Sequence, residues 1–117
     1  LHAIAERAFE AGLAELMPGR PISGVHRAAT ESLARQGLRS YRRGHFGHGV
    51  GQSVFSEQWP YIAADCDAEI EAGMVLAYEI PLYIDGLASF NLEDQFLITT
   101  DGPVSMNRLP RTLGVIG

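Results

Sequence analysis

Two apolar segments joined by a turn dipeptide constrain the fold of this chain more than any other feature. Residues 74–84 and 89–99 are rich in Val, Leu, Ile, Tyr and Phe, and Asp85 and Gly86 lie between them. Runs of this length and composition favour strands, and Asp-Gly is typical of tight hairpin turns. The sequence therefore predicts two long antiparallel strands that pair with each other.

Two helical patterns precede these strands. Over residues 1–17 apolar side chains recur at intervals of three and four, and Pro18 and Gly19 then end the pattern. A second pattern begins at Ser23, a predicted N-cap, and stops at Gly37. The short turn between the two patterns predicts an antiparallel helix pair.

The remaining segments predict loops and short strands. Glycines crowd residues 44–51 and the helical period is lost there, so we expect a tight loop that leads into a strand over residues 48–55. A loop is predicted for residues 56–67 because their Trp-Pro pair resists regular structure, and a last short strand for residues 104–106. No repeat or break in composition marks a second domain. The sequence predicts a single α+β domain over residues 1–117, with the helix pair on one face of a mostly antiparallel sheet.

Composition and charge exclude several classes of protein. The chain has 117 residues, 46% of them hydrophobic, which is enough for one folded core without a disulfide scaffold. Its net charge of −5 argues against nucleic-acid binding, and no apolar run approaches the roughly 18 residues of a membrane span. A single cysteine, Cys66, fits a reducing compartment. We expect a cytoplasmic protein with no nucleic-acid and no membrane partner.

Two carboxylates stand where the strand pattern favours apolar side chains. Glu79 and Glu93 lie at similar distances from the predicted turn, so they are expected to face each other across the two strands. Adjacent buried carboxylates repel unless they share a cation or a proton. His48, between two glycines, adds a nitrogen donor, and one histidine with two carboxylates suits Mn, Fe, Co or Zn. On the residues alone a plainer interpretation stays open, in which both glutamates face solvent and His48 caps a turn.

Three motifs in this chain resemble a known family. Residues 47–51 (GHGVG), 71–79 (EAGMVLAYE) and 92–99 (LEDQFLIT) resemble, in order, the motifs of the pita-bread metallopeptidases, which include methionine aminopeptidases, aminopeptidase P and Xaa-Pro dipeptidases or prolidases. The fourteen-residue spacing of the two glutamates resembles the prolidase branch. The resemblance covers essentially the whole chain, and it implies that residues 1–117 are the C-terminal portion of a pita-bread catalytic domain whose N-terminal portion is absent.

The resemblance also implies an activity and roles for particular residues. His48 and Glu79 would bind one metal of a dinuclear site and act in catalysis, Glu79 as a proton shuttle, while Glu93 would bridge both metals. Substrates would be short peptides with proline at the second position, cut at the N-terminal peptide bond. We predict that Phe55, Trp59 and His45 contact substrate. A core position is equally open for Phe55 and Trp59, and a loop position near solvent is the plainer interpretation of His45.

The chain departs from the family pattern at informative positions. Two aspartate ligands of the family lie upstream of the helix pair, where this chain has no residues. Phe55 stands in place of a second histidine, Ile80 in place of the proline that follows the glutamate, and Asn91 in place of an arginine. We therefore expect weak or absent metal binding and little or no peptidase activity from this chain alone, with the missing N-terminal half or a second copy as partner.

Three hypotheses about function follow. The chain is part of a metal-dependent peptidase, or it is a pita-bread relative without catalysis that binds peptides or proteins, which Phe55, Ile80 and Asn91 favour. The third is a small α+β interaction domain whose sheet edge pairs with itself or with a partner.

Overall fold

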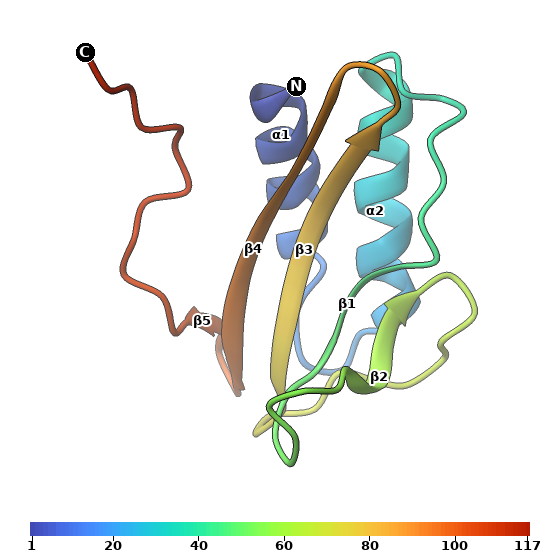
Figure 1. Cartoon of the computed structure of the whole chain (residues 1–117). Coiled ribbons are helices and arrows are strands. Elements are labelled where there is room, and N and C mark those ends of the chain that lie inside the picture. The colour runs from blue at the N-terminus through green and yellow to red at the C-terminus, as the bar shows by residue number, and fades with distance from the viewer.

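The chain forms two helices followed by a five-stranded sheet, as a computed structural model of residues 1–117 shows (Figure 1). The sheet has the order β2-β1-β3-β4-β5, and every neighbouring pair of strands is antiparallel. The elements are α1 (His2–Leu13), α2 (Ile22–Arg35), β1 (His45–Gly49), β2 (Gln58–Ala63), β3 (Val75–Ile84), β4 (Ala88–Thr99) and β5 (Gly102–Ser105). Neither helix has the length and apolarity needed to cross a membrane.

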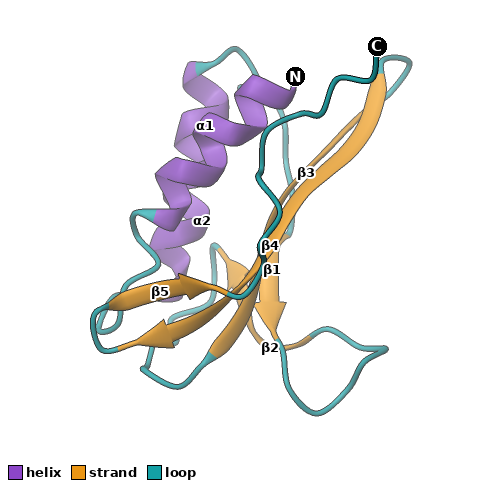
Figure 2. Ribbon diagram, turned by 90° about the vertical axis from the view of Figure 1, so that its left-hand side faces the viewer, coloured by secondary structure: helices purple, strands orange, loops and turns teal.

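Both helices cover the same face of the sheet, and the opposite face is left open (Figure 2). Alternate side chains of β3, including Leu76, Tyr78 and Ile80, are fully buried in the core that the helices and the sheet share. The rings of Phe9 and Tyr78 lie 4.5 Å apart, and the Tyr78 hydroxyl donates to the Ala8 carbonyl at 3.3 Å. Burial, with a smaller contribution from the charge of Glu10, raises the pKa of Tyr78, so this hydroxyl stays protonated. The predicted helix pair on one sheet face is confirmed.

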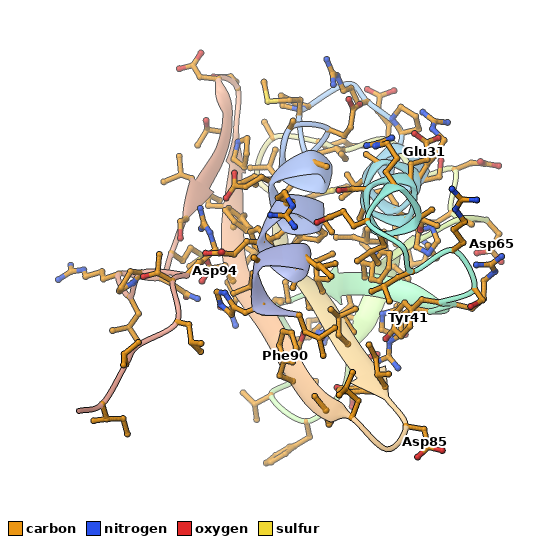
Figure 3. All side chains as sticks on the ribbon, turned by 90° about the horizontal axis from the view of Figure 1, so that it is seen from above. Glu31, Tyr41, Asp65, Asp85, Phe90 and Asp94 are labelled. Carbon is orange, nitrogen blue, oxygen red and sulfur yellow. The ribbon has the colours of Figure 1, made fainter.

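The predicted hairpin is also confirmed. Strands β3 and β4 pair along their whole length, from Val75 opposite Leu97 to Ile84 opposite Ala88. Between them Gly86 adopts a positive φ of 69°, a conformation that glycine reaches without steric cost. The turn forms a tip that projects past the helices, where Asp85 is labelled in Figure 3.

Three local predictions were wrong. The first strand is β1 at His45–Gly49, not residues 48–55, and β2 occupies part of the predicted loop. Strand β2 lies at the edge of the sheet, where a proline such as Pro60 costs no ladder hydrogen bond on its outer side. The N-cap of α2 is Pro21, and Ser23 lies inside the helix. Proline fits a helix start because its missing N–H would have no partner there.

The C-terminal segment is attached to the sheet by one buried carboxylate. Asp94 is 5% exposed and points to the helix side of β4 (Figure 3). It accepts hydrogen bonds from Arg111 at 2.6 Å and from Asn107 at 2.5 Å. Arg111 also lies 3.4 Å from Glu10 of α1 and stacks over the Phe9 ring, 5.1 Å from its centroid. The residues after β5 are thereby joined to both layers of the fold.

Candidate functional site

Two glycines allow the strand that carries His48 to fit between its neighbours. A Cβ added to Gly47 would lie 2.0 Å from the carbonyl oxygen of Ala77 on β3, and one added to Gly49 would lie 2.7 Å from that of Trp59 on β2. Gly47 also has a positive φ of 140°. Only glycine combines the absence of a Cβ with easy access to a positive φ, as position 47 requires. The glycines on both sides of His48 are therefore explained by the close approach of β1 to β3 and β2.

His48 lies on the open face of the sheet. It is paired with Ala77, and Ala77 is paired with Gln95, so the three side chains share one face. The Nδ1 atom of His48 is 3.0 Å from the Gly49 carbonyl oxygen. A carbonyl can only accept, so this contact assigns the hydrogen to Nδ1, and in the neutral ring Nε2 is then the nitrogen with the lone pair.

Glu79 and Glu93 are direct cross-strand partners, as the sequence predicts, and they share the open face with His48. Glu79 is only 7% exposed, whereas Glu93 is exposed. The side-chain amide of Asn91 donates to Glu79 at 2.6 Å and to Glu93 at 3.3 Å. One neutral amide therefore connects the two carboxylates.

The electrostatic environment of Glu93 disfavours its charged form. Partial burial raises the pKa of Glu93, and the negative charge of Glu79 raises it further. The nearby His48 acts in the opposite direction and lowers this pKa, but it does not offset the other effects. The protonated form of Glu93 is thus favoured relative to a freely solvated glutamate.

A cavity of about 520 Å³ opens beside these groups. Its wall contains His48 and Glu93 together with Phe55 and Glu57 from the loop that follows β1. Phe55 is 95% exposed, so its side chain makes almost no packing contacts although it lines the cavity.

His45 and Trp59 lie elsewhere. They line a separate cavity of about 360 Å³, together with Tyr61 and Cys66. The Nε2 atom of His45 is 3.2 Å from Glu57, and the Gly47 amide donates to Nδ1 at 3.4 Å. Of the three predicted substrate contacts, only Phe55 therefore lies in the same cavity as His48.

The residues expected to bind metal have suitable donor chemistry but do not form a metal site as they stand. His48, Glu79 and Glu93 share a sheet face, yet no three His, Cys, Asp or Glu side chains are grouped closely enough to hold an ion. One carboxylate oxygen of Glu79, Oε2, accepts a hydrogen bond from Asn91. The arrangement does not fit a metal in its present form.

Two residues of this site carry contacts that sequence reasoning did not find. Asn91 was recognised as a departure from a pattern, and its bridge to both glutamates was not foreseen. Asn91 lies two residues before Glu93 on the same strand, and residues two apart in a strand share a face. This spacing could have indicated a contact between Asn91 and the glutamates. Glu57 carried no signal, because it lies in a segment without periodicity.

Comparisons with known proteins agree on one family. The profile of metallopeptidase family M24 matches residues 1–100. A probable dipeptidase PepE of Mycobacterium tuberculosis is 35% identical over 115 residues, which cover 98% of this chain and 30% of that protein. A Xaa-Pro dipeptidase of Lactobacillus helveticus is 26% identical over 99% of this chain and 31% of that protein. The crystal structure of dipeptidase PepE from Mycobacterium ulcerans superposes with a TM-score of 0.87 at 32% identity, covering 96% of this chain and 30% of that one. The chain thus spans about 30% of the length of these relatives.

Proposed function

Because this chain belongs to metallopeptidase family M24, we propose that the protein hydrolyses the amino-terminal peptide bond of short peptides, with Xaa-Pro peptides as the substrate class. The names of two relatives, a probable dipeptidase and a Xaa-Pro dipeptidase, support this reaction and substrate class. The observation that carries the proposal is the cavity of about 520 Å³ whose wall combines His48 and Glu93 on the open sheet face. A cavity of this size accommodates a short peptide.

We assign roles within this proposal residue by residue. His48, Glu79 and Glu93 are this chain's candidate donors to a divalent metal such as Mn, Co, Zn or Fe. Glu79 is the candidate for proton transfer, because its carboxylate is almost buried and faces Glu93 directly. Phe55 is the candidate contact for the substrate side chain, since it lines the same cavity.

Metal titration tests the donor assignment. The purified chain is expected to bind Mn²⁺ weakly, and His48→Ala is expected to reduce the affinity about tenfold or more, because even second-shell partners of metal ligands are typically worth 10–100-fold. Calorimetric titration with MnCl₂ measures the difference. His2→Ala serves as the control, since His2 lies on α1 and stacks against Phe90. Equal affinity in His48→Ala and the unchanged chain would refute the assignment of His48.

Phe55→Ala tests the substrate cavity. Because the ring is 95% exposed, the free energy of unfolding is expected to change by less than about 0.5 kcal/mol. Binding of an Ala-Pro dipeptide is expected to weaken about fivefold or more, as loss of an aromatic contact surface costs on the order of 1 kcal/mol. Urea unfolding and NMR titration measure the two effects. Leu113→Ala, an exposed apolar residue in the C-terminal segment, is the control and should leave both unchanged. Unaltered dipeptide binding in Phe55→Ala would exclude Phe55 from the site.

A second candidate function is a binding module that recognises peptides or proteins without cleaving them. The observation that favours it is the Asn91 amide, which bonds to both glutamates that would otherwise be available to a metal. Dipeptide binding without release of free amino acids, in saturating Mn²⁺, Co²⁺ or Zn²⁺, is the result expected for a binding module. Metal-dependent release of amino acids supports the peptidase.

A further inference from the structure

Trp59 and Tyr61 form an exposed aromatic surface at the edge of the sheet. They are two residues apart on β2, so they lie on the same side of the strand, opposite the buried Pro60 and Ile62. Trp59 is 68% exposed and Tyr61 is 36% exposed. Both line the cavity of about 360 Å³, which is separate from the cavity beside His48. Large aromatic side chains left in water at the wall of a cavity offer stacking area to a ligand.

Contacts with neighbouring groups hold part of this aromatic wall in place. The ring of His45 lies 5.5 Å from that of Tyr61, with an angle of 45° between the two planes. The Tyr61 hydroxyl donates to the Glu57 carbonyl at 3.3 Å, and the Glu57 carboxylate lies 3.2 Å from Nε2 of His45. The Tyr61 and His45 rings are therefore positioned before a ligand binds, which lowers the entropy cost of binding.

The cavity has a free carboxylate in its wall and no lysine or arginine. Asp65 lines the cavity and takes part in none of the ion pairs of the structure. It lies at the periphery of the molecule, where a ligand from solvent can reach it (Figure 3). Residues 44–107 contain no lysine or arginine, although they carry most of the acidic side chains of the chain. The wall is thus aromatic and anionic without a cation of its own.

The two arginines that precede the cavity in the sequence contact other partners. Arg42 donates to the carbonyl oxygens of Arg39 at 2.7 Å and of Tyr41 at 2.9 Å. The guanidinium of Arg43 lies over the Tyr83 ring, 5.5 Å from its centroid. Neither arginine is among the residues that line the cavity. The charge of Asp65 is therefore available to a cation from outside the chain.

We infer that this cavity binds the guanidinium group of an arginine side chain carried by a peptide. A guanidinium is planar and positively charged, so it can stack on Trp59 and Tyr61 and also pair with the carboxylate of Asp65. A purely apolar ligand would leave Asp65 without a partner, and an ammonium group has no flat face to stack. The inference goes beyond the proposed function, because it requires neither a metal nor cleavage of a peptide bond.

Trp59 is the only tryptophan of the chain, so its fluorescence reports on this cavity. Acetyl-arginine amide is expected to change the Trp59 emission until the cavity is saturated. Acetyl-citrulline amide has nearly the same shape without the charge, and its affinity is expected to be lower by about fivefold or more, since the cation–π and the carboxylate contacts are both weakened. Acetyl-lysine amide keeps the charge but not the planar group, so its affinity should lie between the two.

Substitutions in the wall test which groups hold the guanidinium. Asp65→Asn is expected to weaken binding of acetyl-arginine amide about threefold, because an exposed charge contact is lost. Asp67→Asn is the matched control, since Asp67 is also exposed and does not line the cavity. Tyr61→Leu is expected to weaken binding as well, whereas Tyr61→Phe keeps the ring and should bind as the unchanged chain does. Phe55→Ala changes only the other cavity, so it should leave this affinity unchanged.

Several results would overturn the inference. Equal affinity for the arginine and citrulline derivatives would show that charge plays no part, and equal or higher affinity for the lysine derivative would show that the planar group plays none. The same affinity in Asp65→Asn and Asp67→Asn would place the contact outside this cavity. Absence of a saturable change in Trp59 emission would show that no guanidinium binds there. The proposed peptidase would survive each of these results, because its own test is binding of Ala-Pro in Phe55→Ala.

Discussion

Replacing Gly47 with alanine is expected to lower the free energy of unfolding by about 3 kcal/mol or more, since a clash inside packed structure and a strained backbone add together. The new Cβ would lie 2.0 Å from the Ala77 carbonyl oxygen, and the backbone at Gly47 has a φ of 140°. Strand β1 would have to move away from β3 to relieve the contact. Urea unfolding monitored by circular dichroism measures the loss.

Gly73→Ala separates the two causes. Gly73 also has a positive φ, of 96°, but no atom lies within 4 Å of the position that its Cβ would take. The free energy of unfolding of Gly73→Ala is expected to fall by only about 1 kcal/mol, which is the cost of the backbone conformation alone. Gly44→Ala, with neither feature, should be close to neutral. Similar losses in Gly47→Ala and Gly73→Ala would show that the contact with β3 contributes nothing.

Arg111→Ala is expected to lower the free energy of unfolding by about 2 kcal/mol, because it leaves the buried carboxylate of Asp94 without its partly exposed cationic partner. Asp94 would keep only the hydrogen bond from Asn107, and the contact of the guanidinium with the Phe9 ring would also be lost. The C-terminal segment should then detach from the sheet. Urea unfolding reports the loss of stability, and limited proteolysis should show earlier cleavage after Ser105.

A double-mutant cycle assigns this loss to the pair. Asp94→Asn removes the buried charge, so combining it with Arg111→Ala should cost clearly less than the sum of the two single variants. Arg108→Ala is the matched control, because Arg108 lies in the same segment and forms no ion pair. Additive losses in the cycle would mean that Arg111 stabilises the fold through its contact with Phe9.

The hairpin, the helix pair and the family were all predictable from the sequence. The α+β arrangement and the resemblance to pita-bread metallopeptidases are confirmed by the fold and by the family match. The hairpin and the helix pair were predictable because each rests on a signal within one segment, such as the Asp85-Gly86 turn, and the family was predictable because three short motifs occur in the expected order. The facing positions of Glu79 and Glu93 followed because strands joined by a short turn have a fixed register.

Strands β1 and β2 were not predictable in the same way. Their positions depend on contacts with other strands: β1 follows from the close approach at Gly47, and β2 is stable as an edge strand only because β1 lies beside it. Neither strand has enough alternating apolar residues to be recognised alone. The Asn91 bridge was missed for a related reason, since it depends on a side-chain direction that periodicity does not encode.

The hairpin turn has a consequence for how this site can vary. The number of residues in each strand between the turn and Glu79 or Glu93 decides which face of the sheet these side chains occupy, so inserting or deleting one residue within either strand would exchange the faces. A single deletion within β4 before Glu93 would bring Asp94 opposite Glu79 and so take away the carboxylate that Arg111 binds on the helix side. Length variation that preserves both the site and the attachment of the C-terminal segment is therefore confined to the turn between Ile84 and Ala88, where hairpin loops of different length join strands of unchanged register.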